Sequence, residues 1–445
     1  MHIRASLAFL LMFVALEGVA HASPYLLFGP MLGHTTSTNA RIWVKASEPA
    51  RVAVRISAAN ASWGTRVIKA ARLTTNDGNA GEIFISGLRP NTQYSYTILL
   101  NGESALSQPY PSFVTPPPEG TDSHVRFAFT SCVGFKGSDS AAGYADMATR
   151  TNFDLLFMLG DNHYANTNDI ARQRLFYGDQ RRQSGWRDLT SRVPTYGIWD
   201  DHDYGPDNSD RTLKGKEVSL RAFREHWANP YYGETNNAGI YSHFSRGNVD
   251  FFLIDVRYHR SPNRDTNGLT KTMLGREQLQ WLKRELLTST ARAKVILSGS
   301  EFQSNGTVDS WASFKRERDE LLDFIKDAEI SGVLLVSGDR HFTAAYQVRT
   351  NWIEVTAGPI GSGNADAKVV SEMFLNYSPT KSKFYCVYDI DTRSRPAAVT
   401  LEVYRVAEGL AQRRVFTWDE VIGKTKIKTL PMPPSKQERA AEKKL

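Results

Sequence analysis

Side chains that can bind metals or transfer protons stand directly after short apolar runs in the second part of the sequence. The first run is followed by a cysteine, and the later runs are followed by aspartate, glutamate, tyrosine or histidine. The segments are Ser131-Cys132, Gly160-Asp161-Asn162-His163-Tyr164, Asp200-Asp201-His202-Asp203, Ser300-Glu301-Phe302-Gln303 and Ser337-Gly338-Asp339-Arg340-His341. Carboxylate oxygens suit hard cations, whereas imidazole and thiolate suit transition metals. The mixed set favours a site with more than one metal, including one Lewis-acidic transition ion.

Each segment taken alone has a simpler explanation. A Gly-Asp pair after a strand is more often a turn than a ligand, a lone buried cysteine usually packs, and residues 200–203 could begin a capped helix. Recurrence at five successive strand ends is harder to explain by turn chemistry. The three carboxylates around His202 would also repel one another unless a cation or basic partner neutralised them. An imidazole there can protonate a leaving-group oxygen or hold a phosphoryl oxygen.

Strands that alternate with helices are needed to position these segments. Apolar runs predict strands at residues 125–130, 155–159, 195–199, 251–254, 295–297 and 332–336, and helices are predicted at 213–227, 276–287 and 316–328. In such α/β folds, ligand groups gather where strands end and loops begin. We expect an α/β domain over residues 124–422.

The first part of the chain has a different pattern. Short β-rich runs at residues 41–44, 52–56, 83–85 and 94–100, separated by turn residues, predict an all-β sandwich over residues 23–113. The segment from Leu88 to Tyr94 resembles the turn-and-tyrosine segment of fibronectin type III modules. Residues 114–123 include three consecutive prolines and predict a stiff linker. We expect the sandwich to have a structural or positioning role, because its sequence shows no cluster of acids, bases or metal ligands.

The two ends of the sequence predict export and a solvated tail. Arg4, the mostly apolar residues 7–19 and Ala20-His21-Ala22 fit a signal peptide over residues 1–22, and the apolar run is too short and interrupted for a membrane anchor. We expect a secreted or periplasmic protein without stable membrane insertion. Most of the formal charge of +7 lies in residues 423–445, where six Lys and one Arg face two Glu. Contact with a membrane surface or polyanion is the alternative to a solvated tail, and nucleic-acid binding is not indicated.

The two cysteines, Cys132 and Cys386, admit two interpretations. An exported protein could oxidise them into one disulfide. Alternatively, Cys386 packs as a small apolar residue in a strand-like run, and Cys132 keeps its thiol for metal binding.

Four motifs resemble those of the alkaline phosphatase D (PhoD-like) family of the calcineurin-like metallophosphatases. They are Thr130-Ser131-Cys132, Gly160-Asp161-x-x-Tyr164, Trp199-Asp200-Asp201-His202-Asp203-Tyr204-Gly205-Pro206 and Ser337-Gly338-Asp339-Arg340-His341. The resemblance spans residues 23–417. It implies a four-layer α/β/β/α metallophosphatase domain preceded by a small β domain. It also implies an exported enzyme that hydrolyses phosphate mono- or diesters by attack of a metal-bound hydroxide.

The resemblance further implies cofactors and residue roles. Fe³⁺ and Ca²⁺ are the implied cofactors, with other divalent metals as the alternative. The implied metal ligands are Cys132, Asp161, Tyr164, Asp201, Asp339 and His341. Asp161 would bridge the metals, and the Cys132 thiolate and Tyr164 phenolate would bind iron. His202 and Asp203 would be catalytic, and Asp207, Asn208 and Arg340 would bind substrate.

Departures from the family pattern leave three assignments open. Asp207-Asn208 reverses the order expected in the family, so either residue could be an extra oxygen ligand. His163 replaces an apolar residue, and we expect a surface histidine, with a supplementary ligand as the alternative. Glu301 and Gln303 stand at a strand end where related phosphatases carry a ligand.

An alternative function is a non-catalytic surface-binding protein with a degenerate phosphatase fold. It predicts losses at the motif positions, and the sequence shows none. For the enzyme we expect a small phosphate-ester substrate, a monomer, and no regulatory nucleic-acid partner.

Overall fold

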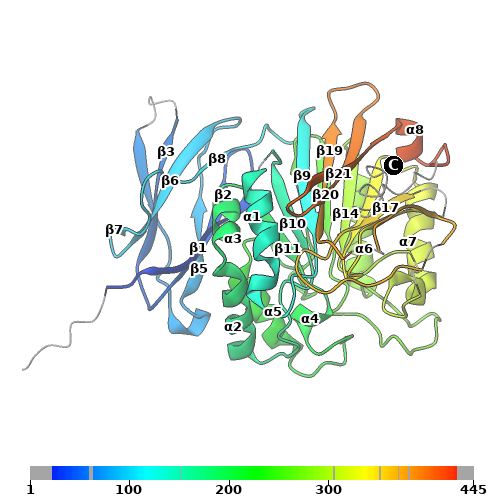
Figure 1. Ribbon diagram of the computed structural model, residues 1–445, viewed down its shortest axis with the longest axis horizontal. Coiled ribbons are helices and arrows are strands. Elements are labelled where there is room, and N and C mark those ends of the chain that lie inside the picture. The colour runs from blue at the N-terminus through cyan, green and yellow to red at the C-terminus, as the bar shows by residue number, and fades with distance from the viewer. Residues whose placement is uncertain are drawn as a thin grey trace, which may run out of the picture.

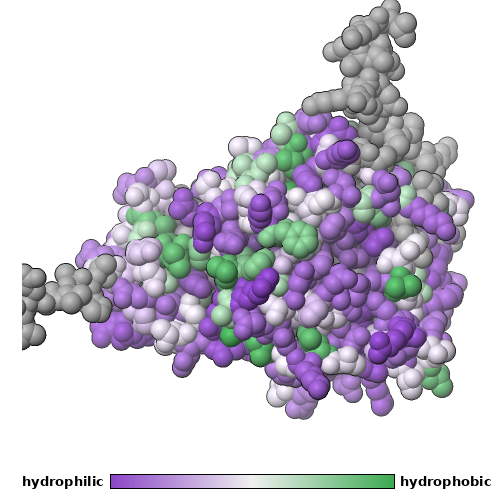
Figure 2. Space-filling view, turned by 60° about the horizontal axis from the view of Figure 1, so that its bottom comes forward, coloured by the Kyte–Doolittle hydropathy of each residue, from purple (hydrophilic) through white to green (hydrophobic). Residues whose placement is uncertain are grey.

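The computed structural model describes residues 23–59, 64–150, 152–303, 306–349, 352–368, 370–378 and 381–427. The predicted signal peptide at residues 1–22 and residues 428–445 of the predicted tail lie outside these ranges. Among the described residues, no helix is long and apolar enough to cross a membrane. The face shown in Figure 2 is mostly hydrophilic, with hydrophobic side chains in small groups.

Two antiparallel sheets pack against each other in the N-terminal part, as the alternating β-rich runs predict. One contains β1 (Leu26–Thr35), β2 (Ala40–Ala46) and β5 (Ala80–Ile85), and the other contains β3 (Val52–Ala58), β4 (Thr65–Lys69), β6 (Gln93–Leu100), β7 (Glu103–Ser104) and β8 (Ser112–Val114). Ile42, Val54 and Ile98 are fully buried in the core between them. The Arg89 N–H donates to the Tyr94 hydroxyl at 2.9 Å, which ties the turn to β6.

The N-terminal sandwich is hydrogen-bonded to the rest of the chain. The Trp43 indole N–H donates to the Glu225 carbonyl at 2.7 Å, and the Tyr96 hydroxyl donates to the Ser191 carbonyl at 2.7 Å. At Gly33 a Cβ atom would lie 2.3 Å from the Cβ of Ala228, so the close approach of β1 requires glycine. These contacts hold the sandwich against the second part of the protein.

Two mixed sheets form the second part. The first has the order β11-β10-β9-β19-β20-β21, and the second has the order β12-β13-β14-β15-β17-β16-β18. Their bounds are β9 (His124–Thr130), β10 (Leu155–Leu159), β11 (Thr195–Ile198), β12 (Ser242–Arg246), β13 (Val249–Leu253), β14 (Ala293–Ser298), β15 (Val333–Ser337), β16 (Ala344–Val348), β17 (Trp352–Thr356), β18 (Met373–Asn376), β19 (Phe384–Asp391), β20 (Ala398–Arg405) and β21 (Gly409–Phe416). Strands β9–β11 are parallel, and so are β13, β14, β15 and β17.

Helices cover the outer faces of the two sheets (Figure 1). α1 (Ala141–Thr149), α2 (Ile170–Arg181), α3 (Ser184–Thr190) and α5 (Lys216–His226) lie on the side of the N-terminal sandwich, and α6 (Arg276–Thr288) and α7 (Lys315–Asp327) lie on the opposite side. The short helices are α4 (Asp201–Tyr204), α8 (Trp418–Val421) and the 3₁₀ turns η2 (Thr75–Asp77), η3 (Gly137–Ser140) and η4 (Trp311–Phe314). Between the sheets, the rings of Phe127 and Phe251 meet edge to face at 5.1 Å. The mixed α/β class predicted from the sequence is confirmed.

Candidate metal centre

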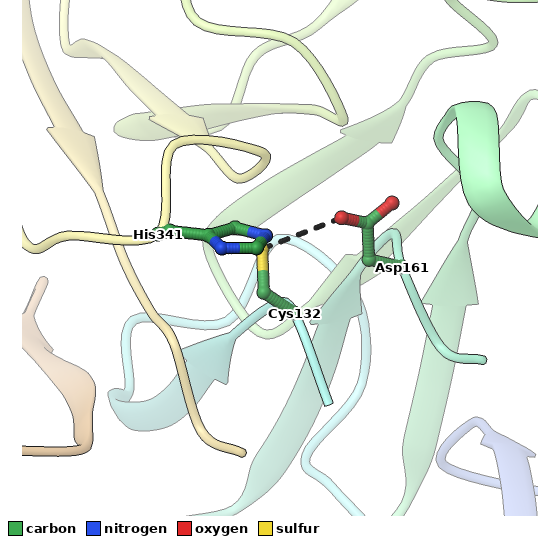
Figure 3. Close-up of side chains that lie close together, drawn as sticks. All are labelled: Cys132, Asp161 and His341. Carbon is green, nitrogen blue, oxygen red and sulfur yellow. Dashed lines mark hydrogen bonds between the residues drawn. The ribbon is translucent and has the colours of Figure 1, made fainter. Parts of the chain in front are cut away.

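Cys132 and Asp161 lie just beyond the carboxyl ends of the neighbouring parallel strands β9 and β10. Both are in the left-handed backbone region, with φ of 59° and 52°, a conformation that is uncommon for non-glycine residues. The Cys132 thiol lies 3.5 Å from Oδ2 of Asp161, and both residues are buried. Figure 3 shows the Asp161 carboxylate turned toward the thiol, with the His341 imidazole beside it. Both cysteines are free and buried, so the alternative disulfide between Cys132 and Cys386 is not formed.

Tyr164 and His341 close this side of the cluster. The Tyr164 hydroxyl donates to Oδ2 of Asp161 at 3.0 Å and lies 2.9 Å from Nε2 of His341. Asp339 and His341 follow β15 and also have positive φ, 70° and 53°. Thiol, phenol, imidazole and carboxylate thus come from the ends of three strands in two sheets.

The candidate ligand atoms form three overlapping groups. In each group the atoms lie within 4.8 Å of one another, and the groups are Cys132–Asp161–His341, Asp161–Asp201–His202 and Asp200–Asp201–Asp339. Asp161 belongs to the first two groups, which is the arrangement that a bridging carboxylate needs. Asp201 belongs to the second and third. Five of the six predicted ligands belong to these groups, and Tyr164 joins them through its contacts with Asp161 and His341. Their role as metal ligands stays a prediction.

Buried oxygens without partners indicate that the cluster suits cations. Oδ1 of Asp161 and Oδ2 of Asp200 are buried and have no hydrogen-bond partner in the described part of the chain. Burial raises the pKa of Asp161 well above its usual range, and the nearby carboxylates of Asp201 and Asp200 raise it further. Burial and the Asp161 carboxylate likewise raise the pKa of the Cys132 thiol. Positive charge bound among these groups would restore their ionised forms.

His202 is a partly exposed member of the cluster. Its Nδ1 is 2.6 Å from Oδ1 of Asn166, and its ring lies 4.1 Å from the ring of Tyr164. Its Nε2 is 3.9 Å from Oδ1 of Asp207, an exposed residue. The Asn208 N–H donates to Oδ2 of Asp201 at 2.8 Å, whereas the Asn208 side chain donates to Asp207 at 2.7 Å. The structure thus places Asp207 and Asn208 at the exposed edge of the cluster, where Asp207 lies near His202 and the Asn208 backbone contacts Asp201.

Asp203 is turned into the protein interior. Its Oδ1 accepts the Asn162 N–H at 2.8 Å, and its Oδ2 accepts the Asp200 N–H at 3.0 Å. Burial raises the pKa of Asp203 to about 8. The bond from Asp200 N–H caps the start of α4, which is the alternative that the sequence also allowed for residues 200–203. Asp203 therefore positions Asp200. Its predicted catalytic role stays a prediction.

Arg340 and the residues after β14 lie on the other side of Asp339. The Arg340 guanidinium is 3.5 Å from Oδ2 of Asp339 and 3.5 Å from Oε2 of Glu301. Glu301 is fully buried, which raises its carboxyl pKa well above the usual range. The Gln303 N–H donates to Glu354 at 2.8 Å. Neither Glu301 nor Gln303 belongs to a ligand group among the described residues.

The expectation that His163 is a surface residue is wrong. His163 is fully buried, and its ring meets the ring of Tyr177 on α2 edge to face at 4.3 Å. Burial lowers the pKa of His163 to about 3, so the imidazole is neutral. Its side chain packs against α2, whereas Asp161 and Tyr164 contact the cluster.

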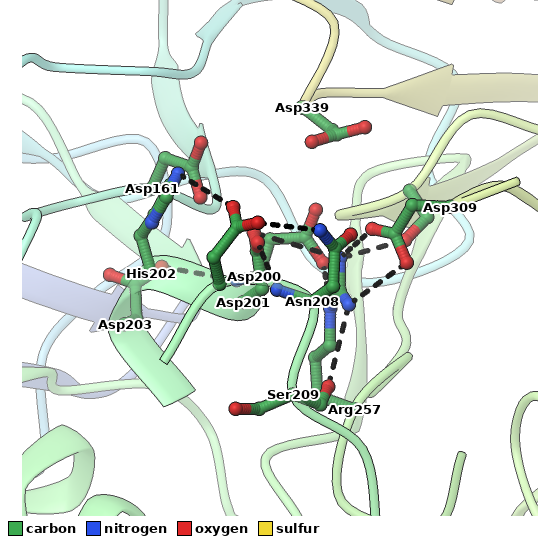
Figure 4. Close-up of polar contacts among 12 residues, drawn as sticks. Asp161, Asp200, Asp201, His202, Asp203, Asn208, Ser209, Arg257, Asp309 and Asp339 are labelled. Carbon is green, nitrogen blue, oxygen red and sulfur yellow. Dashed lines mark hydrogen bonds and ion pairs between the residues drawn. The ribbon is translucent and has the colours of Figure 1, made fainter. Parts of the chain in front are cut away.

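A buried ion-pair network that the sequence motifs did not indicate lies behind the acidic residues (Figure 4). Nε of Arg257 donates to Asp200, its guanidinium is 3.6 Å from Asp201, and it donates to Asp309 at 2.6 Å. Arg260 adds a second contact to Asp309 at 2.5 Å. Burial tends to raise the pKa of Asp201, but Arg257, His202 and the Asn208 N–H together outweigh it, so this pKa is lowered. The available signal was that Arg257 stands shortly after the predicted strand at 251–254, as the other site residues follow theirs.

The fold and the site define an α/β protein. Its candidate metal-ligand residues cluster at the carboxyl ends of strands from two facing sheets. The chain belongs to the PhoD-like phosphatase family, whose model matches residues 127–384. A second model, a domain of unknown function (DUF7800), matches residues 23–118.

Two curated relatives carry phosphatase names. Alkaline phosphatase D of Bacillus subtilis (strain 168) is 24% identical over 356 residues, which cover 66% of this chain and 60% of that protein. The match thus spans less than two thirds of that relative's length. Purple acid phosphatase 23 of Arabidopsis thaliana is 22% identical over 340 residues, which cover 72% of this chain and 69% of that protein.

Solved structures show the same fold. A structure of PhoD matches with a TM-score of 0.76 and 20% identity, and covers 93% of this chain and 94% of that one. Purple acid phosphatase PPD1 from yellow lupin (Lupinus luteus) seeds matches with a TM-score of 0.65 and 15% identity, and covers 88% of this chain and 73% of that one. At these identities the likeness concerns the fold alone.

Proposed function

We propose that this protein is an exported, metal-dependent phosphoesterase that hydrolyses phosphate monoesters, diesters or both. The observation that carries the proposal is the sharing of Asp161 between two ligand groups, Cys132–Asp161–His341 and Asp161–Asp201–His202. The family and the phosphatase names of the relatives support it. The low-identity structural matches support the four-layer α/β/β/α arrangement, and the Arg89–Tyr94 contact supports a fibronectin type III-like sandwich.

The donor set fits two kinds of cation. The thiol of Cys132, the phenol of Tyr164 and the imidazole of His341 are suited to a transition ion, for which we propose Fe³⁺. The carboxylates of Asp201 and Asp339 are suited to a hard cation, for which we propose Ca²⁺. When bound, such cations activate water and neutralise charge on the transferring phosphoryl group.

The chain's own groups orient the ester and handle protons. The Asn166 oxygen accepts the proton on Nδ1 of His202, which orients the ring. Nε2 is then the ring nitrogen left to interact with the ester. In the imidazolium form Nε2 also carries a proton, with which His202 can hold a phosphoryl oxygen or protonate the leaving-group oxygen. Arg340 adds positive charge beside Asp339 and is suited to binding a phosphate oxygen. Asp203 holds the helix start that carries Asp200, Asp201 and His202.

Hydrolysis of 4-nitrophenyl phosphate and bis(4-nitrophenyl) phosphate tests the proposal. We expect the purified protein to cleave at least one of them, to lose activity after chelation, and to regain it with iron and calcium. The His202→Ala variant should keep the metal bound by Cys132, Asp161 and His341 but lose most of the activity. Inertness of the metal-loaded protein to both esters would favour the non-catalytic alternative.

A further inference from the structure

Phe135 presents an aromatic ring to solvent beside the metal centre. It stands three residues after Cys132, and 65% of its surface is exposed. Its ring lies 4.8 Å from the ring of Tyr164, which is itself buried. Single exposed apolar residues are common and need no explanation by themselves. Phe135 differs because the ring that it contacts belongs to the candidate ligand set.

The loop that carries Phe135 is held on both sides. The Val133 N–H donates to the Asp161 carbonyl at 3.1 Å, and the Lys136 N–H donates to Oδ2 of Asp139 at 2.9 Å. At Gly134, with φ of 98°, a Cβ atom would lie 2.6 Å from the Cβ of Asp139. The backbone on either side of Phe135 is therefore held by hydrogen bonds and close packing, and it places the ring next to Tyr164.

The buried Tyr164 ring contacts two more accessible rings. The partly exposed His202 ring lies 4.1 Å from it at an interplanar angle of 33°. The exposed Phe135 ring contacts it at an angle of 44°. Because the carboxylates beside His202 are buried, the alcohol portion of an ester bound at His202 would extend toward solvent, where the Phe135 ring is exposed. An exposed aromatic ring there can stack on a planar group.

We propose that Phe135 is a platform for the alcohol portion of the substrate and makes the enzyme selective for phosphate esters with a planar, aromatic alcohol portion, such as an aryl or heteroaryl group. This inference rests on the proposed phosphoesterase function. The platform contributes to ester binding and takes no part in bond cleavage.

Steady-state kinetics of Phe135→Ala with two monoesters tests the platform. For 4-nitrophenyl phosphate we expect KM to rise about fivefold with little change in kcat, because stacking contributes to binding. For glycerol 3-phosphate, which has no ring, we expect both constants to be unchanged. Phe135→Tyr should keep the wild-type values. Phe135→Leu keeps an apolar side chain but has no ring, so it should behave like Phe135→Ala. It replaces the alanine variant in the test if that variant is unstable.

Phe84→Ala is the matched control, because Phe84 is 53% exposed on β5 of the N-terminal sandwich. It should leave both KM values unchanged. Equal changes for the two esters in Phe135→Ala, or no change for either, would overturn the platform while the phosphoesterase proposal stands. A metal-loaded wild type that cleaves neither ester would overturn both. Metal content is measured on every variant. A variant that keeps its metal but has a raised KM has lost stacking, whereas a variant that loses metal has a disturbed Tyr164.

Discussion

The thiol sulfur of Cys132 lies 3.5 Å from Oδ2 of Asp161, although 29 positions separate the two residues in the sequence. The adjacent parallel strands β9 and β10 bring them together, and a positive φ at each residue turns the backbone where the strand ends. A thiol and a carboxylate buried this close keep their protons unless a cation compensates their charge. The pair therefore links the fold directly to metal binding.

Asp161→Asn should stabilise the metal-free protein and weaken metal binding. Burial and neighbouring carboxylates raise the pKa of Asp161, so the ionised form costs folding free energy when no cation is present. We expect a higher melting temperature than wild type in chelator and a smaller increase on addition of metal. A lower melting temperature in chelator would contradict this account of the cluster.

Asp203→Asn should have the opposite effect on stability. An amide can accept only one of the two backbone N–H bonds that Asp203 now accepts, so its NH₂ would face the other donor. The expected loss is about 1–3 kcal/mol of unfolding free energy, measured by urea denaturation. Metal content should stay near that of wild type, and a large loss of metal without loss of stability would assign Asp203 to the ligands instead.

Arg257→Gln should be strongly destabilising. The fully buried guanidinium neutralises Asp200, whereas Asp309 is shared with Arg260, so removal of the Arg257 guanidinium leaves the buried Asp200 carboxylate without a counter-charge. Breaking such a pair costs about 3–5 kcal/mol of unfolding free energy. The double variant Arg257→Gln/Asp200→Asn should recover part of the loss, and strict additivity of the two single changes would argue against direct coupling.

The metal-free protein should lose stability as the pH rises from 6.5 to 8. Burial raises the pKa of Asp203 to about 8, so over this interval the folded state retains a proton that the unfolded state has already released. Burial raises the pKa of Asp200 to about 6, so most of its contribution is lost at lower pH. The stabilisation by the retained proton is complete below the pKa that the group has in the unfolded state. It is lost as the pH rises through the pKa that the group has in the folded state. Burial lowers the pKa of His34 and His163 to about 3, and their opposite effect appears only below pH 6.5.

Thermal melting in chelator at several pH values measures this loss. In Asp203→Asn the decline between pH 6.5 and 8 should be shallower, because one titrating group is removed. A melting temperature that is constant or rises over this interval in the wild type would show that these carboxyls do not titrate as the burial indicates.

The strand-end residues could be predicted from the sequence because apolar runs mark the strands and polar residue types mark the segments that follow them. The helices predicted at 276–287 and 316–328 agree with α6 and α7 within a residue or so at each end. Arg257 was missed because a lone arginine after a strand carries no motif, and its role depends on Asp200 and Asp309, far away in the chain. His163 was misplaced because sequence spacing does not show which side of a turn faces α2.

Elemental analysis combined with 4-nitrophenyl phosphate hydrolysis, before and after chelation, tests the metal centre most directly. The wild type should contain iron and a second metal, lose both metals and activity on chelation, and regain activity on reloading. Cys132→Ser should bind less iron and remain poorly active under the same conditions. A wild-type protein that is fully active after all metal has been removed would contradict the account.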